Sequence, residues 1–163
     1  MTRLFASAAA PTTVILPIPN ERMLHVCWAA CLVPIVAFCT GRKRFVTQHE
    51  LCAAAGRRPT DGATTDDMAK ALMRAAHIKT YPTPALSVES TVKLLANQQP
   101  IVLILDVGEG FHCVTLRGMV RDDTNAWHAV INEPNFNTDH SVFVPFARVH
   151  AAWRSGLIVA GRA

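Results

Sequence analysis

The chain has 163 residues, of which 50% are hydrophobic and 17% are charged. This length suits about one domain with a buried core, and the composition excludes an intrinsically disordered chain. The net charge of +4 is mild, and the basic clusters at Arg42 to Arg44 and at Arg57 and Arg58 are not interleaved with aromatic residues. Such clusters are typical of solvated loops, so we expect no nucleic-acid partner.

The apolar stretch from Val26 to Cys39 is interrupted by Pro34 and is too short to span a bilayer. We therefore expect a core helix there and no membrane partner. Residues 1–14 are expected to be a flexible leader or linker, and residues 15–163 a single folded domain. The five cysteines are an odd number and show neither a CxxC pair nor a zinc-ligand spacing. We expect mostly buried, reduced thiols and no metal site.

Helices are predicted in the first half of the chain. Thr47-Gln-His-Glu50 has the spacing of a capping box, and Gly56 would end the helix that follows it. Pro34 is expected to bend the first helix or to end its first part. Helices are expected at Cys27–Cys39, at about Gln48–Ala55, from Thr65 over the apolar stripe of Met68, Ala71, Leu72 and Ala75, and at Ser87–Gln98.

Strands are predicted in the second half. The continuous apolar run from Ile101 to Val107 suits a buried strand, and Asp122 to Asn125 is a hairpin-type turn. Strands are expected at Ile101–Val107, Phe111–Val120, Trp127–Asn132, Val142–Val144 and Leu157–Ala160, with a short helix at Phe146–Arg154. Helices followed by an antiparallel sheet predict the α+β class.

Cys27 lies where a loop is expected to turn into the first helix, directly before Trp28. A thiol at a helix start faces unpaired backbone N–H groups and the positive end of the helix dipole, which favour the thiolate. We therefore interpret Cys27 as a candidate nucleophile, which needs an imidazole as its base.

His112 follows a Gly-Glu-Gly-Phe turn at the start of a predicted strand. A histidine there is held by the sheet while its ring points past the sheet edge, which suits a general base. The neighbouring strand ends in Asn132-Glu133-Pro134, beside His112 in an antiparallel pair. Either Asn132 or Glu133 can accept the imidazole N–H and fix its tautomer. His25 is a rival base, but a residue in an extended entry segment usually points away from the helix start.

Three motifs in order, Cys-Trp-Ala-Ala from Cys27, Gly-x-His-x-Val around His112, and Asn-Glu-Pro from Asn132, resemble papain-like cysteine peptidases. The similarity is greatest to the C39-like and AvrRpt2-like group, which includes effector proteases of plant pathogens, and it covers roughly residues 15–160. It implies a papain-like fold, in which a helical N-terminal half with the nucleophile at a helix start packs on a C-terminal antiparallel sheet.

The chain departs from the family pattern at two positions. The family usually has Asp before the proline, where this chain has Glu133, so Asn132 stays a candidate for the same role. The family also has a Gln about six residues before the cysteine, whose amide helps to bind the oxyanion. Glu21 stands there in this chain, and Asn20, one residue earlier, is the expected donor. Otherwise backbone N–H groups at the helix start, including that of Cys27, would bind the oxyanion.

The resemblance implies a thiol protease that cleaves peptide bonds in target proteins without a cofactor or metal. It also implies a bacterial effector or toxin module, secreted or delivered into a target cell and active in the cytoplasm there. A protein substrate is then expected, with an immunity or activating protein as a possible second partner. The alternatives are a cell-wall amidase or acyltransferase on the same triad, a leader-peptide peptidase, or a non-catalytic papain-fold binding module, the last motivated by Glu21.

Overall fold

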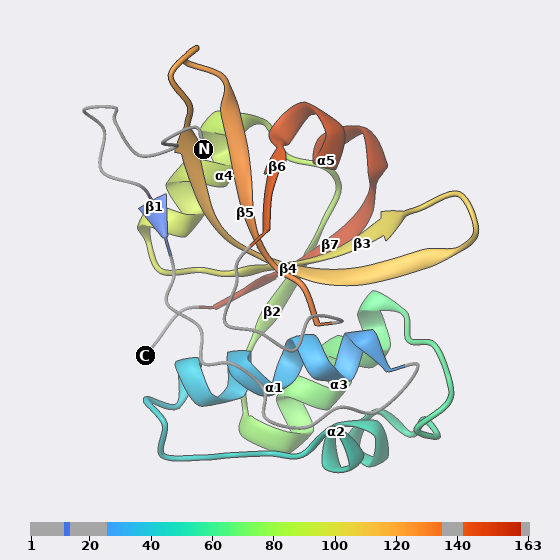
Figure 1. The fold of residues 1–163 in the computed structure, drawn as a ribbon. Coiled ribbons are helices and arrows are strands. Elements are labelled where there is room, and N and C mark those ends of the chain that lie inside the picture. The colour runs from blue at the N-terminus through green and yellow to red at the C-terminus, as the bar shows by residue number, and fades with distance from the viewer. Residues whose placement is uncertain (1–11, 14–25, 135–141, 161–163) are drawn as a thin grey trace.

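The structure is a computed structural model, and it describes residues 12–13, 26–134 and 142–160. The helices are α1 (Cys27–Cys39), α2 (Gln48–Ala55), α3 (Thr65–Ala76), α4 (Val88–Ala96) and α5 (Phe146–Ala152). The strands are β1 (Thr12–Thr13), β2 (Thr80–Thr83), β3 (Ile101–Asp106), β4 (Phe111–Arg121), β5 (Trp127–Asn132), β6 (Val142–Pro145) and β7 (Trp153–Val159). This arrangement confirms the α+β class, with α1, α2 and α3 gathered on one side of the sheet (Figure 1).

Local signals in the sequence set the ends of the helices. The Thr47 side chain accepts from the backbone N–H of Glu50, and the Glu50 carboxylate accepts from the Thr47 N–H, so the predicted capping box begins α2. Gly56 ends α2 at a φ of 75°, in the left-handed region that glycine adopts without strain. Helix α1 continues through Pro34 to Cys39, so the proline does not end it.

All paired strands are antiparallel and form one sheet, in the order β2-β7-β3-β4-β5-β6, with β1 paired to β4. In the β3–β4 hairpin, His112 lies opposite Leu105, close to the turn that joins the two strands. Strand β1 lies within the range expected to be a leader, at Thr12–Thr13. No helix in the described part of the chain is both long and apolar enough to cross a bilayer.

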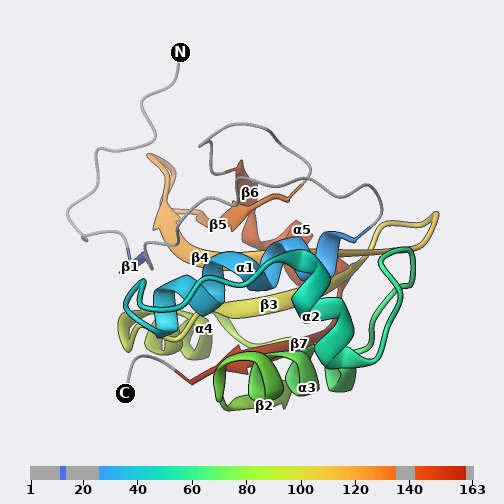
Figure 2. The ribbon, with the colours of Figure 1, turned by 90° about the horizontal axis from the view of Figure 1, so that it is seen from below.

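The sheet separates two hydrophobic cores, because successive residues of a strand point to opposite faces. On β4, Cys113 belongs to the core under α1, α2 and α3, whereas Val114 and Leu116 belong to the core on the other face, which also contains Leu95 of α4 and Val149 of α5. Figure 2 shows α1 beside β4 and α3 beside β7. Strand β4 therefore contributes to both cores.

Besides β1, two elements differ from the expectation. Strand β2 was not predicted, and β7 begins at Trp153, where the sequence favoured a helix up to Arg154. Gly156 explains why β7 can pack so closely, because a Cβ there would lie 2.9 Å from the backbone oxygen of Val102. Long-range pairing with β2 and β3 thus overrides the weak strand propensity of the Ser155-Gly156 pair.

Candidate active site

Cys27 is the first residue of α1 and is half-buried. No side chain caps this helix start at Val26, so the first backbone N–H groups are available to an anion. The neighbouring Trp28 is 2% exposed, and its indole N–H donates to the backbone oxygen of Asp61 at 3.1 Å. Trp28 therefore packs under the helix and ties its start to the loop that follows α2.

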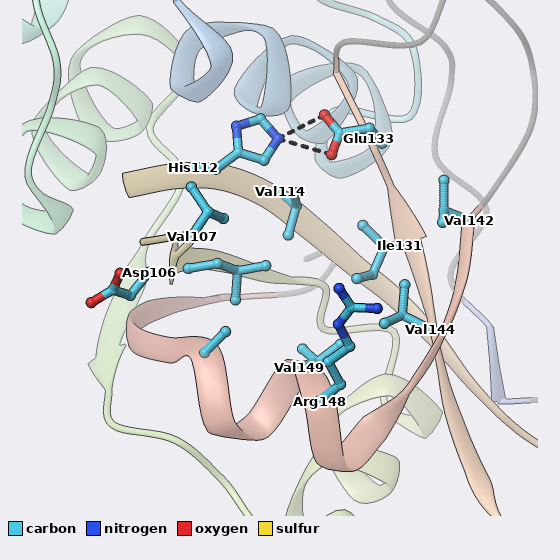
Figure 3. Close-up of a pocket in the computed structure, with 12 residues that line it drawn as sticks. Asp106, Val107, His112, Val114, Ile131, Glu133, Val142, Val144, Arg148 and Val149 are labelled. Carbon is cyan, nitrogen blue, oxygen red and sulfur yellow. Dashed lines mark hydrogen bonds and ion pairs between the residues drawn. The ribbon is translucent and has the colours of Figure 1, made fainter. Parts of the chain in front are cut away.

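His112 is held from one side by Glu133, which comes directly after β5. The His112 Nε2 atom lies 2.7 Å from one carboxylate oxygen of Glu133 and 2.8 Å from the other. Figure 3 shows this contact, with the second ring nitrogen turned away from the carboxylate. The Cys27 thiol is close enough to the His112 side chain for the two groups to shift each other's pKa. Because Nε2 is bonded to Glu133, Nδ1 is the ring nitrogen left for Cys27.

The Cys27 thiol is acidified by its neighbours. Burial would raise the pKa of Cys27, but hydrogen bonds from the His112 side chain and the Cys113 backbone, the positive charge of His112 and the Trp28 backbone together lower it. The backbone donors stabilise the thiolate as they would an oxyanion. The Cys113 N–H was not foreseen from the sequence, because a backbone donor leaves no signal in residue type.

The imidazole is correspondingly basic. Its hydrogen bonds to Cys27 and then to Glu133 outweigh burial and raise the pKa of His112 to about 10. A lowered thiol pKa beside a raised imidazole pKa favours a thiolate and an imidazolium at neutral pH. The arrangement can therefore present a charged nucleophile beside a proton donor.

The structure brings Glu133, and not Asn132, to the imidazole. Asn132 is the last residue of β5 and is opposite Thr115, so its side chain leaves the other face of the strand. No hydrogen bond in the described part of the chain joins Asn132 to His112. The longer side chain of Glu133 reaches the ring from the position where the family usually has Asp.

The other residues singled out in the sequence have different places. Asn20, Glu21 and His25 lie outside the described residues, so the side-chain donor for an oxyanion stays a prediction. His128 lies at the start of β5, with Nδ1 3.6 Å from a carboxylate oxygen of Asp122 in the β4–β5 turn. His128 pairs with Val120, which lies far along β4 from His112, so it takes no part in this site.

The remaining cysteines are free thiols. Cys31 of α1 and Cys113 of β4 are both buried, and a hydrogen bond with Cys31, together with burial, raises the pKa of the Cys113 thiol. A raised pKa keeps a thiol protonated and unreactive. Among the described residues, no three side chains that bind metals are grouped together.

A pocket of about 560 Å³ opens beside the His112–Glu133 pair. Figure 3 shows it between the strands and α5, with His112 and Glu133 along one wall. Its lining residues are Leu105, Asp106, Val107, His112, Val114, Ile131, Glu133, Val142, Val144, Arg148, Val149 and Ala152. This volume lies in the range of small-ligand sites.

Comparison with known proteins places this geometry in context. The family described as papain-like cysteine protease AvrRpt2 matches residues 14–147. No curated protein sequence matches the chain. A putative C39-like peptidase from Bacillus anthracis is similar in structure, with a TM-score of 0.66 at 15% identity over 95% of this chain and 100% of that one.

Two further structures share the fold. The peptidase domain of Streptococcus ComA, a bifunctional ABC transporter, has a TM-score of 0.61 at 12% identity, over 88% of this chain and 96% of that one. The proform of the ragweed pollen cysteine protease Amb a 11 also has a TM-score of 0.61, at 11% identity, over 96% of this chain and 67% of that one. These similarities confirm the papain-like fold that the three motifs implied.

Proposed function

Because this chain belongs to the AvrRpt2 family of papain-like cysteine proteases, we propose that it hydrolyses peptide bonds in target proteins, with Cys27 as nucleophile. The observation that carries the proposal is the contact of both Glu133 oxygens with Nε2 of His112, at 2.7 and 2.8 Å. This contact fixes the ring and leaves Nδ1 for the Cys27 thiol. The cysteine hydrolase activity of the family supplies the reaction class.

In the proposed reaction, the Cys27 thiolate attacks the carbonyl carbon of the scissile peptide bond. The C–N bond then breaks as the protonated His112 donates its proton to the leaving amine, which forms a thioester on Cys27. His112 then takes a proton from water, whose oxygen attacks the thioester carbon. The C–S bond breaks, which releases the carboxylic acid product and restores the Cys27 thiolate beside the protonated His112. Backbone N–H groups at the start of α1 and the Asn20 amide are the proposed donors to the oxyanion.

Cleavage of a peptide library tests this proposal. The library is made by proteolysis of a cell extract, and new termini are identified by mass spectrometry. The wild type should cleave it, Cys27→Ala should not, and Cys39→Ala should cleave like the wild type, because Cys39 lies at the other end of α1. Cleavage by Cys27→Ala, or none by the folded wild type, would contradict the proposal.

We further propose that the protein acts as a bacterial effector or toxin, delivered into the cytoplasm of a target cell and controlled by an immunity or activating protein. The resemblance to effector proteases supports this role. Expression inside candidate host cells should impair growth for the wild type and not for Cys27→Ala. Equal growth with both would remove the toxin role while leaving the peptidase activity to stand on the library result.

The same preparations separate the alternatives. Release of products from peptidoglycan fragments, with no cleavage of the peptide library, would identify a cell-wall amidase instead. A Cys27 thiol that iodoacetamide does not alkylate at neutral pH would favour a non-catalytic binding module, because the lowered pKa of Cys27 predicts rapid alkylation.

A further inference from the structure

The pocket beside His112 is mostly apolar, although the charged pair of His112 and Glu133 borders it. Its walls are mostly aliphatic and come from four strands, β3, β4, β5 and β6, and from α5. His112 and Glu133 form part of one wall, so a side chain inside the pocket belongs to a substrate residue close to the scissile bond, because each residue of an extended chain spans at most about 3.6 Å.

Four lining residues carry ionisable side chains, and three of them are directed elsewhere. Glu133 contacts His112 with both oxygens. Asp106 accepts from the backbone N–H of Gly108 at 3.0 Å and points away from the pocket in Figure 3. His112 itself faces Glu133 and Cys27. These contacts leave Arg148 as the charged group available to an occupant.

Arg148 reaches the pocket from α5. Figure 3 shows its guanidinium directed past Val149 toward Ile131 and Val144, along the apolar wall. Among the described residues, no carboxylate forms an ion pair with Arg148, and its side chain is exposed. A guanidinium that is always charged and has donors to spare favours a carboxylate partner.

We propose that this pocket binds one substrate side chain next to the scissile bond and that Arg148 selects glutamate there, against lysine and arginine. The aliphatic walls would contact the methylene groups of the glutamate side chain, and the guanidinium would bind its carboxylate. A lysine of similar length would meet a like charge at Arg148, which is unfavourable. This inference rests on the proposed peptidase function and adds the substrate preference.

The test compares substrates within each variant, using the same peptide library. In the wild type, one position near the scissile bond should favour glutamate over lysine by roughly tenfold. Arg148→Glu should reverse this preference, and Arg148→Met should abolish the difference while keeping aliphatic residues acceptable. The ratio of two substrates cancels any effect of the new charge on the reactivity of Cys27.

Lys70→Glu is the matched control. It makes the same change of charge at an exposed residue of α3, which contributes nothing to the pocket, and it should leave every preference unchanged. Circular dichroism melting of each variant verifies folding. Cleavage by Arg148→Glu with the wild-type preference at all positions would overturn the inference alone. Absence of any Cys27-dependent cleavage by the wild type would overturn both it and the proposed function.

Discussion

At the scale of single residues, Glu133 does two things for His112. Its carboxylate orients the ring through Nε2. After the hydrogen bond that His112 donates to Cys27, the hydrogen bond to Glu133 and the charge of Glu133 help to raise the pKa of His112. We expect Glu133→Ala to lower kcat/KM on the order of 100-fold, because both effects disappear. Glu133→Gln should retain part of the activity, since the amide oxygen can still accept the Nε2 proton.

Asn132→Ala is the control for these two variants. Asn132 shares the strand end but leaves its other face, so kcat/KM on a peptide chosen from the library should change by less than about threefold. A larger loss with Asn132→Ala than with Glu133→Ala would assign the orienting role to Asn132.

The pH dependence of kcat/KM follows from the two shifted pKa values. Activity should rise with pH as the Cys27 thiol, whose pKa is lowered, loses its proton, and fall as His112 loses the proton that the leaving amine needs, at about pH 10. Because Glu133 raises the pKa of His112, Glu133→Ala should move the alkaline limb to lower pH. Stopped-flow alkylation of Cys27 across pH provides an independent measure of the thiolate.

The sequence predicts the parts of the site that have a local signal. Cys27 is the first residue of α1 and His112 the second residue of β4, and the signals that start those elements are visible in the sequence. The choice between Asn132 and Glu133 depends on how β4 pairs with β5, which contains a register shift between Leu116 and Gly118. A one-residue shift exchanges the two faces of a strand, so spacing alone could not decide it.

At the scale of elements, the same distinction explains the fold. The helix predicted at about Gln48–Ala55 is confirmed as α2, because Thr47, Glu50 and Gly56 are local end signals. Strand β2 contains Pro82 and has four residues, and it exists because it pairs with β7. Arg148 could not be assigned to the pocket either, because only the packing of α5 on the sheet decides which of its residues meet the cavity.

The start of α3 provides a stability prediction. Asp67 closes a capping box with Thr64 and forms an ion pair with Arg57 at 2.8 Å. We expect Asp67→Ala to lower the free energy of unfolding by about 1–3 kcal/mol, since a cap and a partly buried ion pair are both lost. Asp66→Ala, in the same turn, should cost less than about 1 kcal/mol. Urea denaturation at neutral pH measures both.

The same residue makes stability depend on pH. Burial opposes ionisation of Asp67, but hydrogen bonds from Thr64 and Arg57 outweigh it and lower the pKa of Asp67 to about 2. A depressed carboxyl pKa stabilises the fold above the unfolded value of 3.8, and this contribution is lost as the pH falls toward 2. The stability difference between the wild type and Asp67→Ala should therefore shrink on acidification. A difference that stays constant down to pH 2 would contradict this assignment.

At the scale of the whole molecule, the helical half and the sheet half are joined by β4. The strand places Cys113 in one core and Leu116 in the other, and it also carries His112, which must meet Cys27 of α1. A reaction that needs groups from both halves requires the halves to keep one relative position. Because β4 is one continuous strand that packs into both cores, it holds the two halves in one relative position.

Unfolding should therefore be a single transition, even when only one core is damaged. Leu116 is fully buried, so Leu116→Ala should destabilise the protein by about 2–5 kcal/mol, and the helices should unfold at the same urea concentration as the sheet. Tryptophan fluorescence reports on Trp28 in one core and on Trp153 in the other, against which Trp127 also packs. Far-ultraviolet circular dichroism reports on the backbone. The two curves should coincide, as they should for Met73→Ala, a control at a residue that is 41% exposed. Separate transitions in Leu116→Ala would mean that the two halves are independently stable units, and that the Cys27–His112 contact depends on their docking rather than on β4.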